Sequence, residues 1–205
     1  MGAAPFPAPR STLGHGRPPL SVLLSVLLAG CLHRTRVSEL DLPPEAAFEA
    51  WAHEAGAERD YADFVAFLGE QGLADVVPPW HLWRQGTDWR EVGEPAWAAP
   101  PRGDWPAITP TLRLLRERVV PEVGPVVVVS AFRTPRFNER AGGAPGSRHK
   151  NFDAVDVVPK RLWSRARLHE ALLRLWTLEG PALKLGLGLY GGTRFHVDCW
   201  KHRKW

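Results

Sequence analysis

The run of four valines at 126–129 constrains the fold of this chain more than any other feature. Consecutive β-branched apolar residues favour a short strand that is buried on both faces, and Ser130 ends the run. A second short strand is predicted at 154–158, where valines alternate with Asp156. Two buried strands need further elements to cover them, so the second half of the chain is expected to build a layered domain around a small sheet.

The remaining elements of this half fit that expectation. Strands are predicted at 185–190 and 194–200, joined by a turn at Gly191-Gly192. A helix is predicted from Thr109-Pro110 onward, with Leu112, Leu115 and Val119 on one face, and an amphipathic helix is predicted at 163–178. Helices that flank a small antiparallel sheet predict an α+β fold.

The segments outside these elements differ in character. Residues 44–73 have a helical pattern with a break at Gly56. Residues 76–108 are rich in proline and tryptophan and have no sustained period, which favours an ordered loop with its tryptophans packed on the domain. An aromatic platform for a glycan or a peptide is the alternative for that segment. Residues 133–148 are glycine-rich and are expected to be irregular.

Residues 1–30 have the pattern of a secretory signal. Two arginines and no acid precede the apolar run at 19–30, which at about twelve residues is too short to span a bilayer. Leu28-Ala29-Gly30-Cys31 is similar to the lipobox of bacterial lipoproteins, although a plain signal peptide is the alternative. We therefore expect a lipid on Cys31 and a tether over 31–43. No aspartate follows the cysteine, which favours a protein anchored to the outer membrane and facing the periplasm.

Charge and cysteine content exclude several classes of protein. The chain has 26 basic and 22 acidic residues, and removal of residues 1–30 leaves 24 against 22, so charge gives no case for nucleic-acid binding. The two cysteines, Cys31 and Cys199, cannot form a disulfide framework or a four-cysteine zinc site. With lipid on the first, the second would be a lone thiol with a buried, inert role.

Three side chains are candidates for a metal site: His149, Asp156 and His196. Two imidazoles and one carboxylate leave a fourth position open for water, as in catalytic zinc sites. Zinc lowers the pKa of such a water toward about 7, which supplies a nucleophile at neutral pH. Neighbouring strands lie about 5 Å apart, so short side chains from two strands can reach one ion. Spacing alone does not separate this site from a loop histidine beside a hydrogen-bonding aspartate.

The surrounding motifs carry more information. They are Ser130-x-x-Arg133, Asn138, Gly142-Gly143, Ser147-x-His149, Asp156, the Gly-x-Gly-x-Tyr of 186–190, His196-Val-Asp198 and Arg203-x-Trp205. In this order they resemble the zinc D-alanyl-D-alanine peptidase family, which includes endopeptidases of bacterial peptidoglycan and phage endolysins. The His-Val-Asp form resembles one branch of that family. The resemblance covers roughly residues 109–205 and not 32–108. Phe152 stands where the family commonly has glycine, and its bulk is expected to narrow the pocket.

The resemblance implies three zinc ligands: His149, Asp156 and His196. It also places Arg133 at the site, where a guanidinium can clamp a substrate carboxylate or polarise the scissile carbonyl. A salt bridge from Arg133 to Asp153 or Glu139 is the alternative. Asn138 and Ser147 are expected to shape the loop beside the site, with a hydrogen bond to substrate as a second role.

The general base is the part of the family pattern that this chain lacks. Better-known members have an acid three residues before the last histidine, and Thr193 stands there. Asp198 is the first candidate for proton transfer, ahead of Asp153 and His202. Asp198 also lies on the same face of its strand as His196, so orienting that imidazole is its other role.

Together these patterns predict a zinc peptidase-like domain at 109–205, preceded by a helical and Trp/Pro-rich extension at 44–108. The expected activity is hydrolysis of peptide bonds in peptidoglycan stem peptides, as a D,D-endopeptidase or a D-Ala carboxypeptidase, with the endopeptidase favoured by the resemblance. The alternatives are a zinc-holding module that binds peptidoglycan without cleaving it, and a zinc amidohydrolase that acts on another amide. The expected partners are peptidoglycan and, through the lipid, a membrane, with no nucleic acid.

Overall fold

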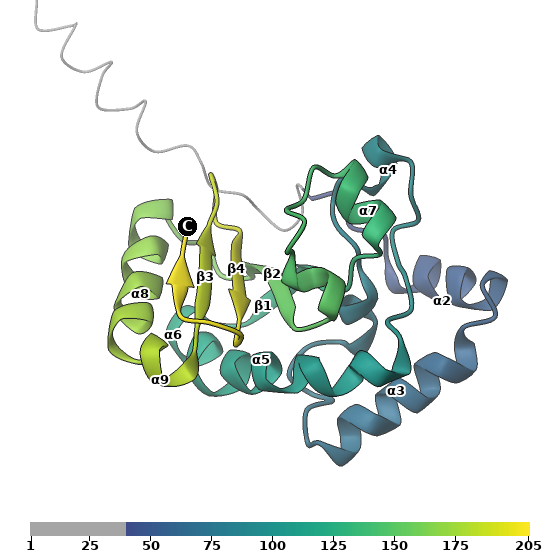
Figure 1. Cartoon of the computed structure of the whole chain (residues 1–205), viewed down its shortest axis with the longest axis horizontal. Helices are drawn as coiled ribbons and strands as arrows, with labels where there is room; N and C mark the ends of the chain where they lie inside the picture. Colours follow the sequence, from purple (N-terminus) through teal and green to yellow (C-terminus); the bar gives the residue numbers. More distant parts are fainter. Residues whose placement is uncertain (1–39) are drawn as a thin grey trace, which may run out of the picture. The chain divides into compact units, whose positions relative to one another are not determined.

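The computed structural model describes residues 40–205 (Figure 1). The expected signal, the lipidation site at Cys31 and the tether up to residue 39 lie outside the described residues. None of the helices in residues 40–205 combines the length and the apolar character that crossing a membrane requires.

A five-stranded sheet with the order β1-β2-β4-β3-β5 carries the second half of the chain. Its strands are β1 (Val126–Ser130), β2 (Ala154–Pro159), β3 (Gly186–Leu189), β4 (Phe195–Asp198) and β5 (Arg203–Lys204). The first four confirm the predicted strands, and each is antiparallel to its neighbours among them. The fifth strand was not expected. It pairs with β3 in parallel, so the sheet is mixed and not purely antiparallel.

One row of paired residues crosses this sheet and places the side chains of the site on one face. Ser130 pairs with Asp156, Asp156 pairs with His196, and His196 pairs with Gly188. Residues that are directly paired in antiparallel strands point their side chains to the same face. Asp156 and His196 therefore project side by side. The place beside them is filled by Trp205, because a Cβ at Gly188 would lie only 2.8 Å from that indole ring.

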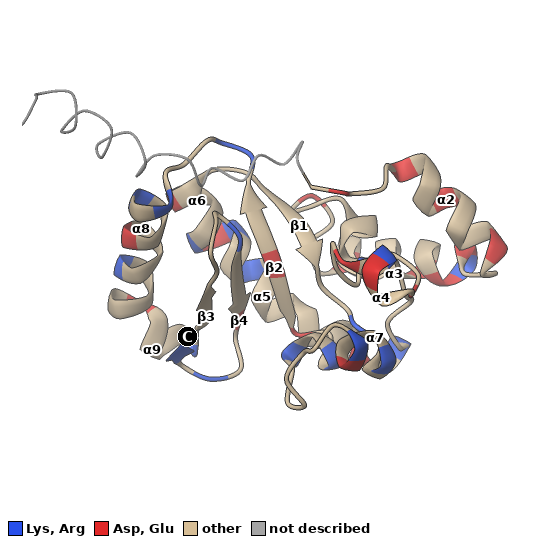
Figure 2. Ribbon diagram, turned by 90° about the horizontal axis from the view of Figure 1, so that it is seen from above, with Lys and Arg blue, Asp and Glu red and all other residues tan. Residues whose placement is uncertain are grey.

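Helices cover the opposite face of the sheet. α5 (Thr109–Leu114), the π-helical turn η4 (Leu115–Val119) and α6 (Val120–Val123) follow one another without a break, and the predicted inward residues Leu112, Leu115 and Val119 are fully buried. α8 (Arg165–Leu178) starts where the Ser164 hydroxyl caps it, and α9 (Gly180–Leu183) follows. Figure 2 shows α5 and α6 behind the strands, with α8 beside α6.

The N-terminal part of the described chain shares the same core. α2 (Glu45–Glu54) and α3 (Glu58–Glu70) confirm the predicted helical segment, and Gly56 breaks it with a φ of +64°. In Figure 1 these helices lie at the end of the fold opposite α8. Phe48, Phe64 and Leu68 belong to one continuous hydrophobic cluster that reaches to Val197 on β4.

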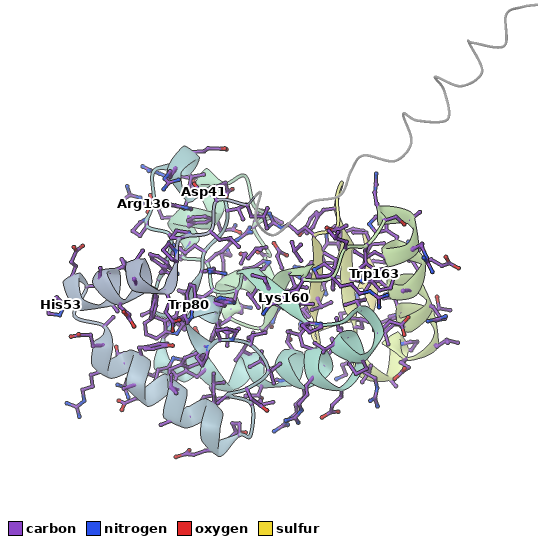
Figure 3. All side chains as sticks on the ribbon, turned by 180° about the vertical axis from the view of Figure 1, so that it is seen from behind. Asp41, His53, Trp80, Arg136, Lys160 and Trp163 are labelled. Carbon is purple, nitrogen blue, oxygen red and sulfur yellow. The ribbon has the colours of Figure 1, made fainter. Side chains whose placement is uncertain are left out.

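Residues 76–108 form an ordered segment around this core. It contains η2 (Pro79–Trp83), α4 (Trp89–Val92) and η3 (Arg102–Ile108) between irregular stretches. Four of its tryptophans are buried: Trp80, Trp83, Trp97 and Trp105. Trp80, labelled in Figure 3, stacks on Phe48 of α2 with ring centroids 6.0 Å apart. The predicted packing role of these tryptophans is confirmed, and their burial argues against an aromatic platform in this segment.

The prediction of an irregular segment at 133–148 is wrong for residues 135–140. These residues form α7 (Pro135–Arg140), because the Thr134 side chain accepts a hydrogen bond from the Phe137 amide and Pro135 occupies the first turn. The same Thr-Pro pair opens α5, so the signal was present in the sequence. A short 3-10 turn, η5 (Arg148–Asn151), ends the segment.

The last residues of the expected tether lie against the sheet. Leu40 and Leu42 pack on three valines of β1 and β2: Val127, Val129 and Val158. Asp41 forms an ion pair with Arg90 at the surface. These contacts fix the start of the described chain to the domain.

Candidate metal centre

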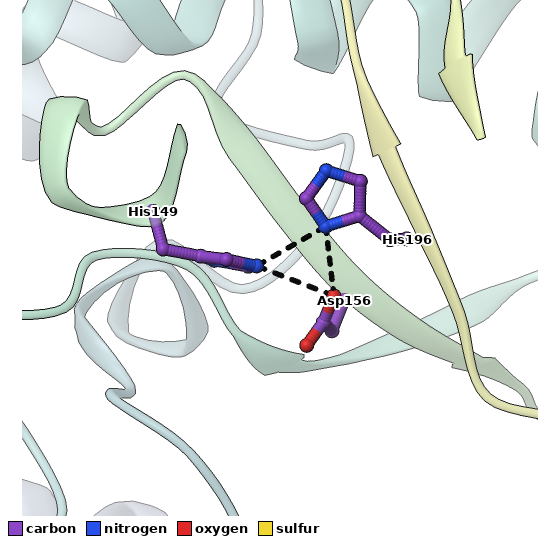
Figure 4. Close-up of side chains that lie close together, drawn as sticks. All are labelled: His149, Asp156 and His196. Atoms are coloured by element: carbon purple, nitrogen blue, oxygen red, sulfur yellow. Dashed lines mark hydrogen bonds and ion pairs between the residues drawn. The ribbon is translucent and has the colours of Figure 1, made fainter. Parts of the chain in front are cut away.

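His149, Asp156 and His196 converge at one point (Figure 4). They come from η5, β2 and β4, and their exposed fractions are 4%, 1% and 4%. His149 Nε2 lies 3.3 Å from Asp156 Oδ1 and 3.2 Å from His196 Nδ1. His196 Nδ1 lies 3.0 Å from the same Asp156 oxygen. The three candidate ligands are thus brought together as a buried group.

The outer nitrogen of each imidazole has a partner that fixes its tautomer. His149 Nδ1 lies 2.8 Å from the carbonyl oxygen of Ala131, which can only accept, so this nitrogen carries the hydrogen. His196 Nε2 lies 2.9 Å from Asp198 Oδ2, which makes it the donor there. In the neutral form that binds a metal ion, an imidazole has one protonated nitrogen, so both rings then turn an unprotonated nitrogen toward Asp156.

This arrangement fits a divalent metal ion. Three lone pairs separated by 3.0 to 3.3 Å repel one another unless a cation lies between them. With zinc–ligand distances of about 2.0–2.1 Å and tetrahedral angles, the donor atoms of a zinc site lie about 3.3 Å apart. The outer hydrogen bonds to a carbonyl and a carboxylate are those that metal-binding histidines usually make.

Asp156 is charged and closely surrounded. Arg133 Nη2 donates to its Oδ2 over 3.3 Å, Arg194 pairs with the same oxygen, and the Tyr190 hydroxyl lies 3.3 Å from Oδ1. Burial alone raises the pKa of Asp156, but the two histidines and Arg194 together hold it well below its usual range. The carboxylate therefore keeps its negative charge at neutral pH.

The two histidines differ in basicity. Burial lowers the pKa of His149, and the attraction of Asp156 offsets only part of that effect. Burial also lowers the pKa of His196, but hydrogen bonds to Asp156 and Asp198 outweigh it and leave the pKa above its usual value. A proton and a metal ion therefore compete for the same group of atoms.

Arg133 is positioned by a segment far away in the sequence. Its Nε donates to the Gln85 carbonyl oxygen over 2.9 Å and to Ser130 Oγ over 2.9 Å. The Ser130 hydroxyl donates to the same carbonyl over 2.6 Å, while Gln85 Oε1 accepts from the amide and the hydroxyl of Thr134. Arg133 forms an ion pair with Asp156. The described contacts of Arg133 include no salt bridge to Asp153 or Glu139, which was the alternative. Arg133 also lines the pocket described below.

Asp198 lies behind His196, on the side away from the pocket. It is fully buried, and its Oδ2 accepts from His196 Nε2 and from Arg203 over 2.8 Å. Its Oδ1 accepts from the Trp200 amide over 2.9 Å and from Arg203 over 3.1 Å. Because both oxygens already accept hydrogen bonds and Asp198 does not line the pocket, the geometry favours the orienting role of Asp198 over proton transfer.

The other two candidates for proton transfer also point elsewhere. Asp153 forms an ion pair with Arg148 through both of its oxygens. His202 stacks on Trp176 with ring centroids 4.2 Å apart. Neither lines the pocket described below.

Asn138 and Ser147 shape the loop between α7 and η5. Asn138 is 3% exposed, and its Nδ2 donates to the Ala144 carbonyl over 3.1 Å. A Cβ at Gly143 would lie 2.2 Å from Asn138 Oδ1, so only glycine fits this close approach. Ser147 lines the pocket, whereas Asn138 does not. A substrate hydrogen bond is therefore within reach of Ser147 alone.

Phe152 does not narrow the pocket, so that prediction is wrong. Its backbone is left-handed, with φ +52° and ψ +38°, a conformation that glycine adopts without strain. Its ring is fully buried and packs against Phe64 and Phe132, with centroids 5.8 and 6.0 Å away. The side chain contributes to the core on the side away from the metal centre.

A pocket of about 430 Å³ opens above the three ligand candidates. Three arginines line it: Arg133, Arg148 and Arg203. Three large aromatic side chains also line it: Tyr190, Trp200 and Trp205. No aspartate or glutamate belongs to its lining among the residues that the structure describes. The walls thus favour a ligand that carries carboxylates and has apolar parts.

Three residues of the site escaped sequence reasoning. Tyr190 stands in the Gly-x-Gly-x-Tyr motif. Arg194 lies two residues before His196, so strand alternation places both side chains on the same face and could have identified Arg194. Gln85 acts mainly through its backbone carbonyl from 48 residues before Arg133. No local pattern marks such a contact.

Comparison with known proteins agrees with this geometry. Residues 84–183 match the family model described as Peptidase M15. The match supports the M15 zinc peptidase family. It begins ahead of residue 109, where the motif resemblance starts, and includes Gln85, Arg133, His149 and Asp156 but not His196. No curated protein and no solved structure matches the chain. The His-Val-Asp branch and the lipoprotein signal stay predictions.

Proposed function

We propose that this protein is a zinc-dependent peptidase that hydrolyses peptide bonds in the stem peptides of peptidoglycan. One observation carries the proposal: three buried acceptor atoms, from His149, Asp156 and His196, converge within 3.3 Å at an arginine-lined pocket. The Peptidase M15 match over residues 84–183 supports the same chemistry. Peptidoglycan as the substrate rests on the motif resemblance and on the charge of the pocket.

The side chains around the ligands have separable roles. His149, Asp156 and His196 would hold the zinc ion, which would supply an activated water and a Lewis acid for the peptide carbonyl. Arg133 reaches the same region with its Nε held by Gln85 and Ser130, so its guanidinium is fixed for a substrate oxygen. Burial and the nearby Asp156 raise the pKa of Tyr190, so this phenol stays protonated and donates a hydrogen bond.

The charge of the pocket supports a carboxylate-bearing peptide. Arg133, Arg148, Arg194 and Arg203 surround the site, against Asp153, Asp156 and Asp198. Asp88 also attracts Arg194, so these side chains balance in charge, while the described lining of the pocket itself has three arginines and no carboxylate. A divalent cation would make the site net positive. Stem peptides carry several carboxylates, which fits this field.

The experiment is digestion of purified sacculi by zinc-loaded protein, with muropeptides identified by mass. His149→Ala is the control, because it removes one of the three candidate metal ligands. We expect cross-linked dimers to disappear only with the intact site. Loss of single D-Ala residues would identify a carboxypeptidase instead. Unchanged muropeptides with a stoichiometric zinc ion bound would contradict the peptidase proposal.

A second candidate is a peptidoglycan-binding module that holds zinc without cleaving. One observation favours it: the described residues that line the pocket include no carboxylate to take a proton. Co-sedimentation with sacculi separates the two candidates. Binding without any released product supports the module, and product formation excludes it.

The proposed location is the outer membrane, through a lipid on Cys31, with the domain facing the periplasm. Support comes from the signal and lipobox pattern of the sequence. Labelling cells with radioactive palmitate tests it. We expect label in the wild-type protein and none in Cys31→Ser, and an unlabelled wild type would leave a plain signal peptide as the better explanation.

A further inference from the structure

A second hollow adjoins the pocket of the metal centre. It has a volume of about 290 Å³, and Thr111, Asp153, Lys184 and Cys199 line it together with Trp200. Trp200 also lines the first pocket. The two hollows therefore meet at one side chain.

The partition between the hollows is an aromatic ring and an ion pair. Trp200 is 53% exposed, and the Arg148 guanidinium lies 4.7 Å from its ring centre. Arg148 lines the first pocket, while its partner Asp153 lines the second, with Arg148 Nε donating to Asp153 Oδ1 over 3.1 Å. A half-exposed indole held in place by a stacked arginine offers a ligand a surface to lie across.

The charged side chains that line the second hollow determine which ligands it can bind. Asp153 is neutralised by Arg148, so its carboxylate contributes little net field. Lys184 is exposed at the end of α9, where its amide donates to the Pro181 carbonyl over 3.3 Å. Its ammonium forms no ion pair within residues 40–205. The hollow thus presents one unbalanced cation, which suits a carboxylate.

We propose that the two hollows form one substrate groove, and that the second hollow binds the far arm of a cross-linked stem peptide through a carboxylate on Lys184. This inference rests on the proposed function and sharpens it to an endopeptidase. Hydrolysis of the cross-link consumes one water and leaves one new carboxylate and one new amine. Trimming of a terminal residue needs the first pocket alone, whereas a cross-link places peptide on both sides of the bond that is cut.

The test compares two substrates: a cross-linked muropeptide dimer and a short linear peptide with the same scissile bond. We expect Lys184→Glu to lower the ratio of kcat/KM for the dimer to kcat/KM for the linear peptide by about tenfold. Lys201→Glu is the matched control, because it makes the same change of charge on the neighbouring surface without lining either hollow. The control should keep the wild-type ratio.

Trp200→Ala is a second variant, expected to lower the same ratio. If both variants keep the wild-type ratio, the second hollow is not a substrate subsite and the inference is overturned. If the wild-type protein cleaves neither substrate, the proposed function fails. Affinities for the two peptides, measured by calorimetry, then test separately whether the two hollows form one binding groove. A dimer affinity that Lys184→Glu weakens about tenfold, and Lys201→Glu does not, supports the groove; equal affinities reject it.

Discussion

At the scale of single residues, the carboxylate of Asp198 determines which nitrogen His196 offers to the centre. Its Oδ2 accepts the Nε2 hydrogen over 2.9 Å, so in the neutral ring Nδ1 carries the lone pair that can bind a metal ion. The same carboxylate binds Arg203 through two hydrogen bonds. Asp198 therefore links the imidazole of a candidate metal ligand to Arg203 in the wall of the pocket.

We predict that Asp198→Ala lowers zinc affinity about 10- to 100-fold, because the imidazole loses the partner that fixes its orientation and tautomer. Competition with a chromogenic chelator measures the affinity. Asp198→Asn keeps the shape and one acceptor, and we expect it to lie between Ala and the wild type. A general base would behave differently: kcat would fall in both variants while zinc affinity stayed at the wild-type value.

The sequence specified the residues of the centre better than their surroundings. His149, Asp156 and His196 were identifiable because family motifs mark them, and strand alternation placed Asp198 beside His196. Gln85 was not identifiable, because a backbone carbonyl can accept a hydrogen bond whatever its side chain is. Contacts of this kind depend on tertiary packing between segments about fifty residues apart, which no local pattern encodes.

At the scale of elements, β5 and the following Trp205 form one wall of the pocket, and β3 holds them in place. The Trp205 amide donates to the Leu187 carbonyl over 3.2 Å, and the Leu189 amide donates to the Trp205 carbonyl over 3.0 Å. These bonds place the indole over Gly188 and within 5.0 Å of the His196 ring. A two-residue parallel strand has too little sequence to be predicted from hydrophobic periodicity.

We predict that Gly188→Ala destabilises the protein by about 1–3 kcal/mol, because the new methyl would overlap the Trp205 ring and crowd the Cβ of His196. Urea unfolding followed by tryptophan fluorescence measures the loss. Gly191→Ala is the matched control, since nothing lies within 4 Å of its added Cβ, and its effect should stay within about 0.5 kcal/mol. Equal stabilities of the two variants would show that the indole does not need the space over Gly188.

At the scale of the whole molecule, the segment before residue 109 contributes both core and site. Phe64 of α3 contacts Phe152 beside η5, with ring centroids 5.8 Å apart. Arg84 donates to the Val128 carbonyl of β1 over 2.8 Å, and Gln85 holds Arg133. The domain boundary expected at residue 108 stays a prediction, and these contacts provide the means to test it.

We predict that a chain containing only residues 109–205 fails to unfold cooperatively and does not bind zinc tightly. Removal of the earlier segment exposes part of the apolar cluster and takes away the acceptor of Arg133. Thermal unfolding by circular dichroism checks this, with residues 40–205 as the control. A cooperative transition in the shorter chain, together with stoichiometric zinc, would establish residue 109 as a true domain boundary.

The pairing of Asp156 with His196 across β2 and β4 has a consequence for folding. A slip of one residue between these strands would turn His196 into the core and present Phe195 or Val197 in its place. Only molecules with the native alignment can gather the three donor atoms, so a bound ion stabilises that alignment against every shifted one. The fraction of molecules that bind a metal ion would therefore report the fraction in which β2 and β4 are paired in the native register.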